Sequence, residues 1–512
     1  MASCQTRAAG PTLVRRVSSS KGMTVSIVEN DSSVAVRVDE LSARRAMVGS
    51  AVAIVREGEL ELFCGHGLAD LGARRPMSFH TVLRVASITK TFTAIGVMQL
   101  VERGRIDLDT AAERYLRAFP LVPADPRFRP ATVRHLLTHT AGIGETAHPA
   151  RVLCPDFGES VGPGRPVPSL SQYYRPGLAV SAEPGTRWTY SNHGFAALGQ
   201  IIADVTGIPL AQYLRENVFR PLGMSDTDLE LTPSMRARLA VGYRLRSRGP
   251  RAIPLREMVT TGAASAYSTP RDMARYLAAL AGGGTNEFGT VLEPDTLAAM
   301  FHAQYQPDPR IPGMGLAFFR GRAGGHRIVE HQGILPGFDS QIWVAPDDKL
   351  AIFACTNGAH RAMLWLPAEI SALMNELLGV RTVTLRTDVA HHPPIWNEIC
   401  GNYYLAAALT DLRARSMIGA GAQVRIQAGR PVLRLLTPVP RLLRGLPLHP
   451  DDPTDPWVFR VDLTHFGIGT GRIVFARDPA TAAMRLHFDL IPITLTRRPP
   501  HHRPDGIPEG LG

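Results

Sequence analysis

The chain has 512 residues, of which 45% are hydrophobic and 20% charged, and its formal net charge is +11 at pH 7. These values are typical of a soluble globular protein that is long enough to bury a large core. Five scattered cysteines without a C-x-x-C pair imply no disulfide framework. Lysine occurs only at positions 21, 90 and 349, so the positive charge comes from arginine.

The arginines are dispersed and form neither a stripe nor a nucleic-acid-binding module. We therefore expect no nucleic-acid partner. No apolar stretch is long enough to span a bilayer, so no membrane span is expected. Residues 1–30 contain Arg15 and Arg16 but no apolar core after them, which is not the pattern of a secretory or twin-arginine signal. We predict a disordered leader over residues 1–30, with Met23 as an alternative start, and a cytoplasmic protein.

Helix and strand patterns begin after this leader. Residues 31–46 have helical spacing and are followed by a predicted hairpin of residues 47–55 and 59–65. Helical patterns then occupy most of residues 87–280. One helix is predicted to start after Thr269, which is a good N-cap followed by proline in the first turn.

Ser87 and Lys90 stand at the start of a helical pattern that ends at Gly104. Residues i and i+3 share a helix face, so the lysine amine can reach the serine hydroxyl. An adjacent base turns a weak serine nucleophile into an active one, and a helix N-terminus favours the developing anion. The same S-x-x-K spacing recurs at residues 18–21. The spacing alone therefore fits a capping serine and a surface lysine equally well.

Tyr190 and Asn192 follow a turn-rich segment and precede a helical pattern that ends at Gly207. A loop–helix junction can direct a phenol and an amide into a cleft, although Tyr190 could equally be an ordinary buried aromatic residue. A short helix is predicted over residues 133–142. His135 and His139 lie on it at i, i+4 spacing, and we interpret them as structural because no third metal ligand accompanies them.

Three further strands are predicted at residues 327–333, 341–345 and 350–355, followed by a helix at 361–378. Gly333 ends the first strand and would let a substrate backbone approach its edge, where a free N–H can bind an oxyanion. His331 is either part of this site or a core histidine bonded to a backbone carbonyl. The Pro/Gly-rich residues 144–185 are predicted to border the site and to set acyl-group selectivity.

Taken together, these motifs resemble the serine β-lactamase-related hydrolases, which include class C β-lactamases, family VIII carboxylesterases and penicillin-binding-protein-like D-amino-acid peptidases. The resemblance covers residues 45–380 and implies an α+β fold, in which an antiparallel sheet flanked by helices joins an all-helical subdomain. The segments that carry it are Ser87-x-x-Lys90, Tyr190-Ser191-Asn192, His331-Gln332-Gly333, HLLTHTAGI, PGTRWTYSN and PLGMSDT.

The resemblance also implies roles for single residues and no metal or cofactor. Ser87 would be the acylated nucleophile, and Lys90 and Tyr190 would remove and return its proton. Which of the two carries the proton stays open, because a coupled pair titrates together. Asn192 would orient the substrate carbonyl side chain, His331 and Gly333 would line the substrate strand, and the backbone N–H groups of Ser87 and Ile334 would bind the oxyanion.

One motif departs from the β-lactamases, which carry Lys-Thr-Gly where this chain has His331-Gln332-Gly333. An imidazole is mostly neutral near pH 7 and binds a carboxylate more weakly than an ammonium does. This favours a carboxylesterase acting on a small-molecule ester or small amide. The alternatives are a β-lactamase or D-amino-acid peptidase of the same fold and, in another class, a catalytically silent scaffold or binding protein.

After Thr382 the pattern changes to period two, for example in residues 459–463 and 484–490, with glycine-rich turns. This predicts half-buried antiparallel strands. The unit resembles the lipocalin-like β-barrel appended to many members of the same hydrolase group. We predict a hydrolase domain over residues 31–382, a small antiparallel β-barrel over 383–498 and a disordered tail over 499–512. The barrel would serve packing or dimer formation, which allows a homo-oligomer.

Overall fold

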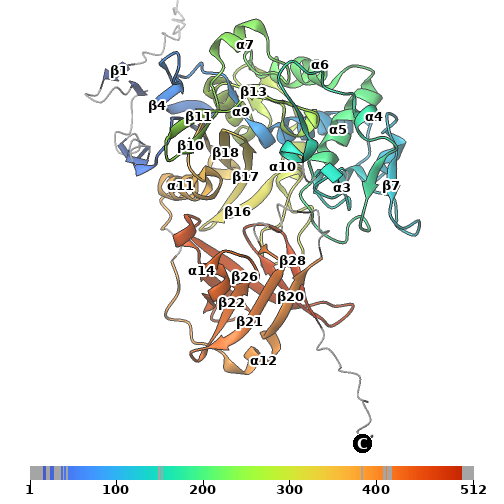
Figure 1. The fold of residues 1–512 in the computed structure, drawn as a ribbon, viewed down its shortest axis with the longest axis vertical. Helices are drawn as coiled ribbons and strands as arrows, with labels where there is room; N and C mark the ends of the chain where they lie inside the picture. Colours follow the sequence, from blue (N-terminus) through green and yellow to red (C-terminus); the bar gives the residue numbers. More distant parts are fainter. Residues whose placement is uncertain are drawn as a thin grey trace, which may run out of the picture. The chain divides into compact units, whose positions relative to one another are not determined.

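The computed structural model of the chain describes residues 15–18, 24–27, 36–38, 40–41, 44–147, 150–151, 154–381, 384–406, 411, 415 and 418–498. The chain divides into two compact units (Figure 1). The first consists of residues 1–305, 314–382 and 466–468, and the second of residues 306–313, 383–465 and 469–512. Two short segments thus belong to a different unit from their neighbours in the chain: residues 306–313 to the second unit and residues 466–468 to the first. No pattern in the sequence predicts this.

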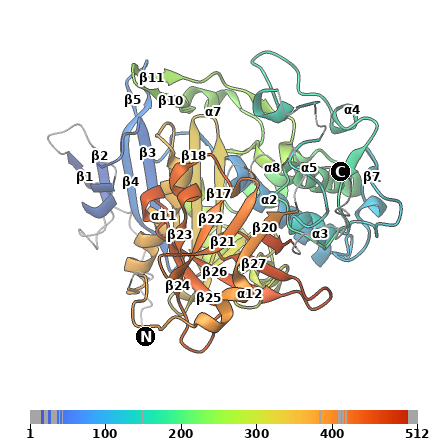
Figure 2. The ribbon, with the colours of Figure 1, turned by 60° about the horizontal axis from the view of Figure 1, so that its bottom comes forward.

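The first unit is built on an antiparallel sheet with the strand order β1-β2-β4-β3-β19-β18-β17-β16 (Figure 2). The predicted hairpin is formed by β3 (Gly49–Arg56) and β4 (Glu59–Asp70). The three predicted later strands are also confirmed and lie next to one another. They are β17 (His326–Leu335), β18 (Phe338–Ala345) and β19 (Leu350–Thr356), with β16 (Phe319–Ala323) at the edge.

The prediction of a disordered leader over residues 1–30 is wrong for two short segments. β1 (Arg15–Ser18) and β2 (Thr24–Ile27) pair with each other, and β2 continues the sheet beside β4 (Figure 2). Both segments contain β-branched residues, and β4 would otherwise present an unpaired edge that a strand can extend. The other residues of the predicted leader lie outside the described part of the chain.

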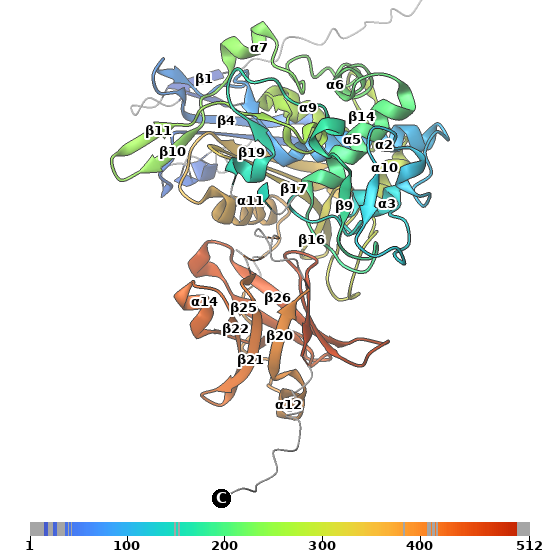
Figure 3. The same ribbon diagram turned by 45° about the vertical axis from the view of Figure 1, so that its right-hand side comes forward.

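Two helices cover opposite faces of this sheet (Figure 3). α9 (Pro270–Ala281) contacts β3 and β19, and the Thr269 side chain caps it as predicted. α11 (Ala362–Leu377) contacts β18 and β19. Successive residues of β19 face two hydrophobic clusters on opposite sides of the sheet. Phe353 packs in the cluster that contains residues of α9, and Ile352 packs in the cluster that contains residues of α11.

The helical part of the first unit holds the candidate nucleophile against the sheet. Ser87 lies in η1 (Ala86–Ile88), which contacts β17 and β18 on the sheet side and α8 (Thr261–Ala264) on the helical side. α2 (Thr89–Glu102) follows η1 directly and packs against α5 (Asn192–Thr206). The remaining helices of this part are α3 (Val133–Leu137), α4 (Leu170–Tyr173), α6 (Leu210–Leu214), the π-helix η5 (Arg215–Phe219), α7 (Pro233–Arg238) and α10 (Pro294–Phe301).

No single helix in the described ranges has both the length and the apolar composition needed to cross a bilayer. α5 and the segment Leu210–Phe219 pass this test only as a pair, and they are bent by 82° relative to each other.

The second unit is a nearly closed antiparallel barrel, coloured orange to red in Figure 1. Only Leu448 separates β23 (Leu446–Pro447) from β24 (His449–Pro450), the strands at the two ends of the strand path. Ile311 is buried against the barrel residues Val458 and Val474. The other strands are β20 (Gly401–Leu405), β21 (Gly421–Gln427), β22 (Arg430–Leu435), β25 (Val458–Asp462), β26 (Thr470–Arg477), β27 (Met484–Phe488) and β28 (Thr494–Arg497). The predicted tail over residues 499–512 lies outside the described residues.

Candidate active site

Ser87 lies in a strained turn at the entrance to α2. Ala86 before it has a φ of 50°, a conformation that is unfavourable for a residue other than glycine and that clusters at functional sites. The Ile88 N–H donates to the Val85 carbonyl at 3.2 Å and closes the turn. Ser87 is 8% exposed whereas Lys90 is fully buried, so the serine keeps a small accessible area while the lysine is closed to solvent.

The Lys90 amine lies within hydrogen-bonding distance of Ser87, Asn192 and Ala263. Its Nζ lies 3.0 Å from Ser87 Oγ, 2.7 Å from Asn192 Oδ1 and 3.0 Å from the Ala263 carbonyl oxygen. The carbonyl and amide oxygens can only accept hydrogen bonds, so two of the amine's hydrogens are directed at them. The remaining position of Nζ faces the serine hydroxyl.

The Tyr190 ring covers the same amine, with Lys90 Nζ 4.8 Å from the ring centroid, within the range of a cation–π contact. His139 supports this ring from behind, since their centroids are 4.5 Å apart. Its Nδ1 also accepts a hydrogen bond from the Ser191 N–H at 3.1 Å. These contacts fit the structural interpretation of His139.

Asn192 is the first residue of α5 and links Lys90 to a carboxylate. Its Oδ1 accepts from Lys90, and its Nδ2 donates to Glu159 Oε2 at 2.5 Å. Glu159 is fully buried and belongs to the Pro/Gly-rich excursion of residues 144–185. The sequence indicated that this excursion borders the site, but no motif or spacing pointed to Glu159.

Gly333 brings β17 close to the turn that carries Ser87. A Cβ atom at this position would lie 2.2 Å from the Val85 carbonyl oxygen and 2.3 Å from Ser340 Oγ. Ser340 Oγ in turn donates to that carbonyl at 2.9 Å. Only glycine fits here because the strand backbone packs on residues 85–86. The explanation expected from the sequence was a close approach of the substrate.

His331 is fully buried in β17, and its Nδ1 lies 2.8 Å from the Gln332 carbonyl oxygen. This contact matches the second interpretation of the residue, a core histidine bonded to a backbone carbonyl. Burial, with a smaller contribution from the nearby Lys90 charge, lowers the pKa of His331 to about 3. The imidazole is therefore neutral at pH 7. Ile334, by contrast, is 42% exposed.

Glu330 precedes His331, and its Oε2 accepts a hydrogen bond from Gln341 Nε2 at 2.6 Å. Burial raises the pKa of Glu330 from the usual 4.5 to about 7. Because this pKa is higher in the folded state, the stability that the group contributes is fully present below pH 4.5. It is lost as the pH rises through 7.

We therefore expect Glu330→Gln to raise the free energy of unfolding at pH 8 by on the order of 2 kcal/mol. Glutamine keeps the acceptor oxygen for Gln341 but carries no buried charge. At pH 4.5, where the glutamate is already protonated, the two proteins should be equally stable. Urea unfolding at both pH values measures the difference, and equal stability at pH 8 would show that the carboxyl ionises without cost.

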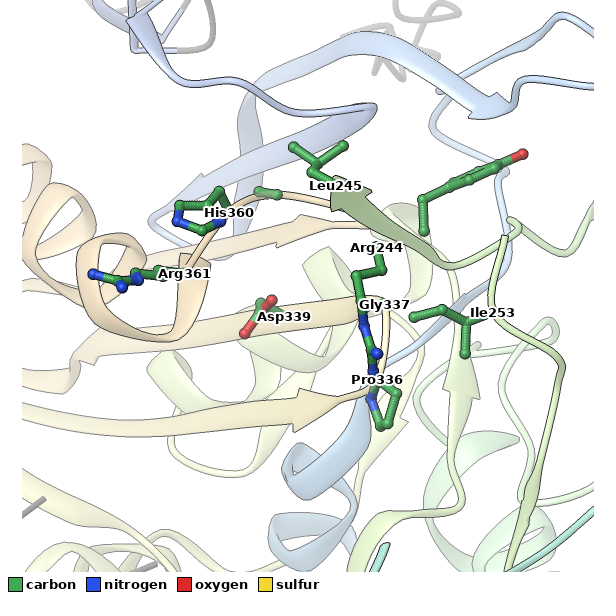
Figure 4. A pocket seen from close by; sticks show the side chains of 10 residues that line it. Arg244, Leu245, Ile253, Pro336, Gly337, Asp339, His360 and Arg361 are labelled. Carbon is green, nitrogen blue, oxygen red and sulfur yellow. The ribbon is translucent and has the colours of Figure 1, made fainter. Parts of the chain in front are cut away.

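A pocket of about 210 Å³ lies beside the turn between β17 and β18 (Figure 4). Asp339 of β18 lines it together with Arg244 and His360, and burial raises the pKa of Asp339 to about 7. A second pocket of about 480 Å³ shares Ile253 with it. Because successive side chains of a strand point to opposite faces and Ser340 faces Val85, Asp339 faces away from the Ser87 side of the sheet.

The helical junctions, the Lys90 contacts and the close approach of β17 assemble one site around Ser87. A family model described as Beta-lactamase matches residues 34–370, about two thirds of the chain. The chain belongs to the beta-lactamase family. The family and the relatives below are serine hydrolases, and the fold is β-lactamase/transpeptidase-like, as the resemblance implied.

The relatives of this beta-lactamase family member differ in activity. Esterase EstB of Burkholderia gladioli is 36% identical over 191 residues, which are 37% of this chain and 48% of that protein. A D-aminopeptidase of Brucella anthropi is 28% identical over 336 residues, which are 65% of this chain and 59% of that protein. The chain thus spans about half the length of these relatives.

Among solved structures, an octameric penicillin-binding protein homologue from Pyrococcus abyssi matches with a TM-score of 0.58 and 21% sequence identity. The match covers 91% of this chain and 99% of that chain. At this identity the likeness concerns the fold alone.

Proposed function

We propose that the protein is a serine hydrolase that acts through an acyl-enzyme on an ester or small amide, with carboxylesterase activity favoured. The observation that carries the proposal is the buried Lys90 amine 3.0 Å from Ser87 Oγ, which also contacts the obligate acceptors Asn192 Oδ1 and the Ala263 carbonyl. A lysine that is held away from water can act as a neutral base, and an adjacent base activates a serine.

The reaction then proceeds in two halves. Lys90 takes the Ser87 hydroxyl proton while Oγ bonds to the substrate carbonyl carbon, and the backbone N–H groups of Ser87 and Ile334 bind the oxyanion. The bond to the leaving alcohol breaks, and the alcohol takes a proton from the Lys90–Tyr190 pair. Water next attacks the acyl-serine and gives up a proton to the same pair. Collapse releases the carboxylic acid and returns the hydrogen to Ser87.

The preference for an ester rests on what β17 presents at the site. His331 replaces the lysine of the Lys-Thr-Gly motif, and it is buried and neutral. It therefore supplies no cation for a substrate carboxylate. The exposed Ile334 side chain points to the face opposite Gly333 and Val85, so Ile334 can serve the site through its backbone N–H alone. The likeness to an esterase supports the same choice.

A small amide is the second candidate, because a D-aminopeptidase is also among the relatives. The test compares p-nitrophenyl butyrate, D-alanine p-nitroanilide and nitrocefin with the purified full-length protein. We expect kcat/KM for the ester to exceed that for nitrocefin by at least about 100-fold, an acylation difference of about 2.7 kcal/mol. A preference for nitrocefin or the anilide would replace the esterase proposal. Folded protein that turns over none of the three and resists a fluorophosphonate probe would be a silent scaffold.

A further inference from the structure

We infer that Glu159 is a positioning residue that fixes the orientation of the Asn192 amide and, through it, the direction in which Lys90 can accept the proton of Ser87. The inference rests on the proposed function, since it explains how the base of that reaction is aimed.

Hydrogen bonds fix the backbone of Glu159 on both sides. Its N–H donates to the Asp156 carbonyl at 2.9 Å, and its own carbonyl accepts from the Val259 N–H at 2.7 Å. The next residues form β8 (Ser160–Val161), which pairs with β12 (Glu257–Met258). The side chain is fully buried, and Thr260 Oγ1 also lies 3.4 Å from its Oε2. The carboxylate therefore has a fixed place beside α5.

This carboxylate decides which way the Asn192 amide faces. An ionised carboxylate only accepts hydrogen bonds, so the group that Asn192 turns toward it has to be the donor, Nδ2. The amide oxygen is then directed at Lys90 Nζ, 2.7 Å away. The flipped amide would set two acceptors against each other at Glu159 and, while Lys90 is an ammonium, two donors against each other at Nζ.

The orientation of the Asn192 amide in turn decides the direction of the lone pair on Lys90 Nζ. A neutral amine has two hydrogens and one lone pair. With Asn192 Oδ1 and the Ala263 carbonyl both accepting, the two hydrogens are directed at these oxygens, and the lone pair can be directed at Ser87 Oγ, 3.0 Å away. If the amide were flipped, the lone pair would be drawn to Asn192 Nδ2, away from the serine.

The charge of Glu159 has a second effect on the same amine. A buried negative charge favours the ammonium form of Lys90, to which it is linked through Asn192. Tyr173 and Tyr174 also face this charge. Burial raises the pKa of Tyr173 to about 12, and the Glu159 charge adds to the rise at both tyrosines. Removing the charge should let the base lose its proton at lower pH.

The test uses Glu159→Gln and Glu159→Met in the full chain, with Glu257→Gln as the matched control. Glu257 is a nearby carboxylate that accepts from the Tyr267 hydroxyl at 2.9 Å and 3.1 Å. Active sites are counted with a fluorophosphonate probe. The rate of acylation by a p-nitrophenyl ester is then measured per active site from pH 5 to 9.

We expect the plateau rate of acylation to fall about 10-fold in Glu159→Gln, where the amide can face either way, and about 100-fold in Glu159→Met, which offers no acceptor oxygen. In both variants the rising limb of the pH profile should move to lower pH, while KM stays within about 2-fold. Glu257→Gln should leave the plateau rate and the limb unchanged. If Glu159→Met does not fold, Glu159→Gln alone carries both readouts.

Two results would overturn the inference. One is a Glu159→Gln variant whose plateau rate of acylation and whose rising limb of the pH profile are both the same as in the wild type. The other is a loss of active sites without any change in the rate or limb per site, which is what a purely structural carboxylate would give. Failure of the proposed function looks different, because the wild-type protein itself would then neither react with the probe nor turn over an ester.

Discussion

Ser87→Ala should abolish labelling by a fluorophosphonate probe and lower ester hydrolysis by about 10³-fold or more, because it removes the hydroxyl that lies beside the Lys90 amine. Folding should be unaffected, since an alanine methyl group fills the same turn and only the contact from Lys90 Nζ is lost. Labelling followed by gel fluorescence, together with p-nitrophenyl butyrate hydrolysis, measures the effect.

The chain supplies its own control for this substitution. Ser18 stands three residues before Lys21 and so repeats the S-x-x-K spacing away from the site. Ser18→Ala should keep full labelling and full hydrolysis. If Ser87→Ala retained half or more of the wild-type labelling, the nucleophile would be another residue and the proposed mechanism would be wrong.

Lys90→Met should lower the rate of acylation by about 10²- to 10⁴-fold, the usual contribution of a general base. Methionine has a similar length and no charge, so it fills the space of the buried side chain without replacing the proton acceptor. The loss should appear in kcat with little change in KM, because Lys90 is fully buried and is not expected to contact the substrate. Single-turnover acylation with a p-nitrophenyl ester measures it.

Lys349→Met is the matched control for Lys90. Lys349 is an exposed lysine whose Nζ lies 2.9 Å from Glu57 Oε2. A surface pair of this kind is worth about 0–1 kcal/mol, and its loss should leave acylation unchanged. If Lys90→Met acylated at a rate within 3-fold of the wild type, Tyr190 or another group would have to be the base.

The parts of the site that the sequence predicted are those encoded by local spacing. Ser87 and Lys90 are three residues apart at a helix start, and the loop–helix junction at Asn192 is marked by the Ser191 cap and by Gly207. The strands β17, β18 and β19 likewise follow from alternating apolar residues and turn signals. Such features depend on neighbours in the chain, so one sequence is enough to predict them.

The parts that the sequence could not predict depend on contacts between distant segments. Glu159 meets Asn192 across 33 positions, and the Ala263 carbonyl meets Lys90 across 173. Neither residue has a type or spacing that distinguishes it from other loop residues. The sequence predicts that His331 lies in a strand. Its burial, however, depends on how β17 packs against η1. The pairing of β1 and β2 is equally non-local, because it needs the edge of β4.

The proposed mechanism requires a covalent bond between the substrate and Ser87 Oγ. Rapid acid quenching of the protein with a slowly deacylating p-nitrophenyl ester, followed by intact-mass measurement and peptide mapping, tests it directly. We expect one added acyl group per chain, on the peptide that contains Ser87, and none in Ser87→Ala. An acyl group on a different residue, or ester turnover with no covalent adduct at any quench time, would contradict it.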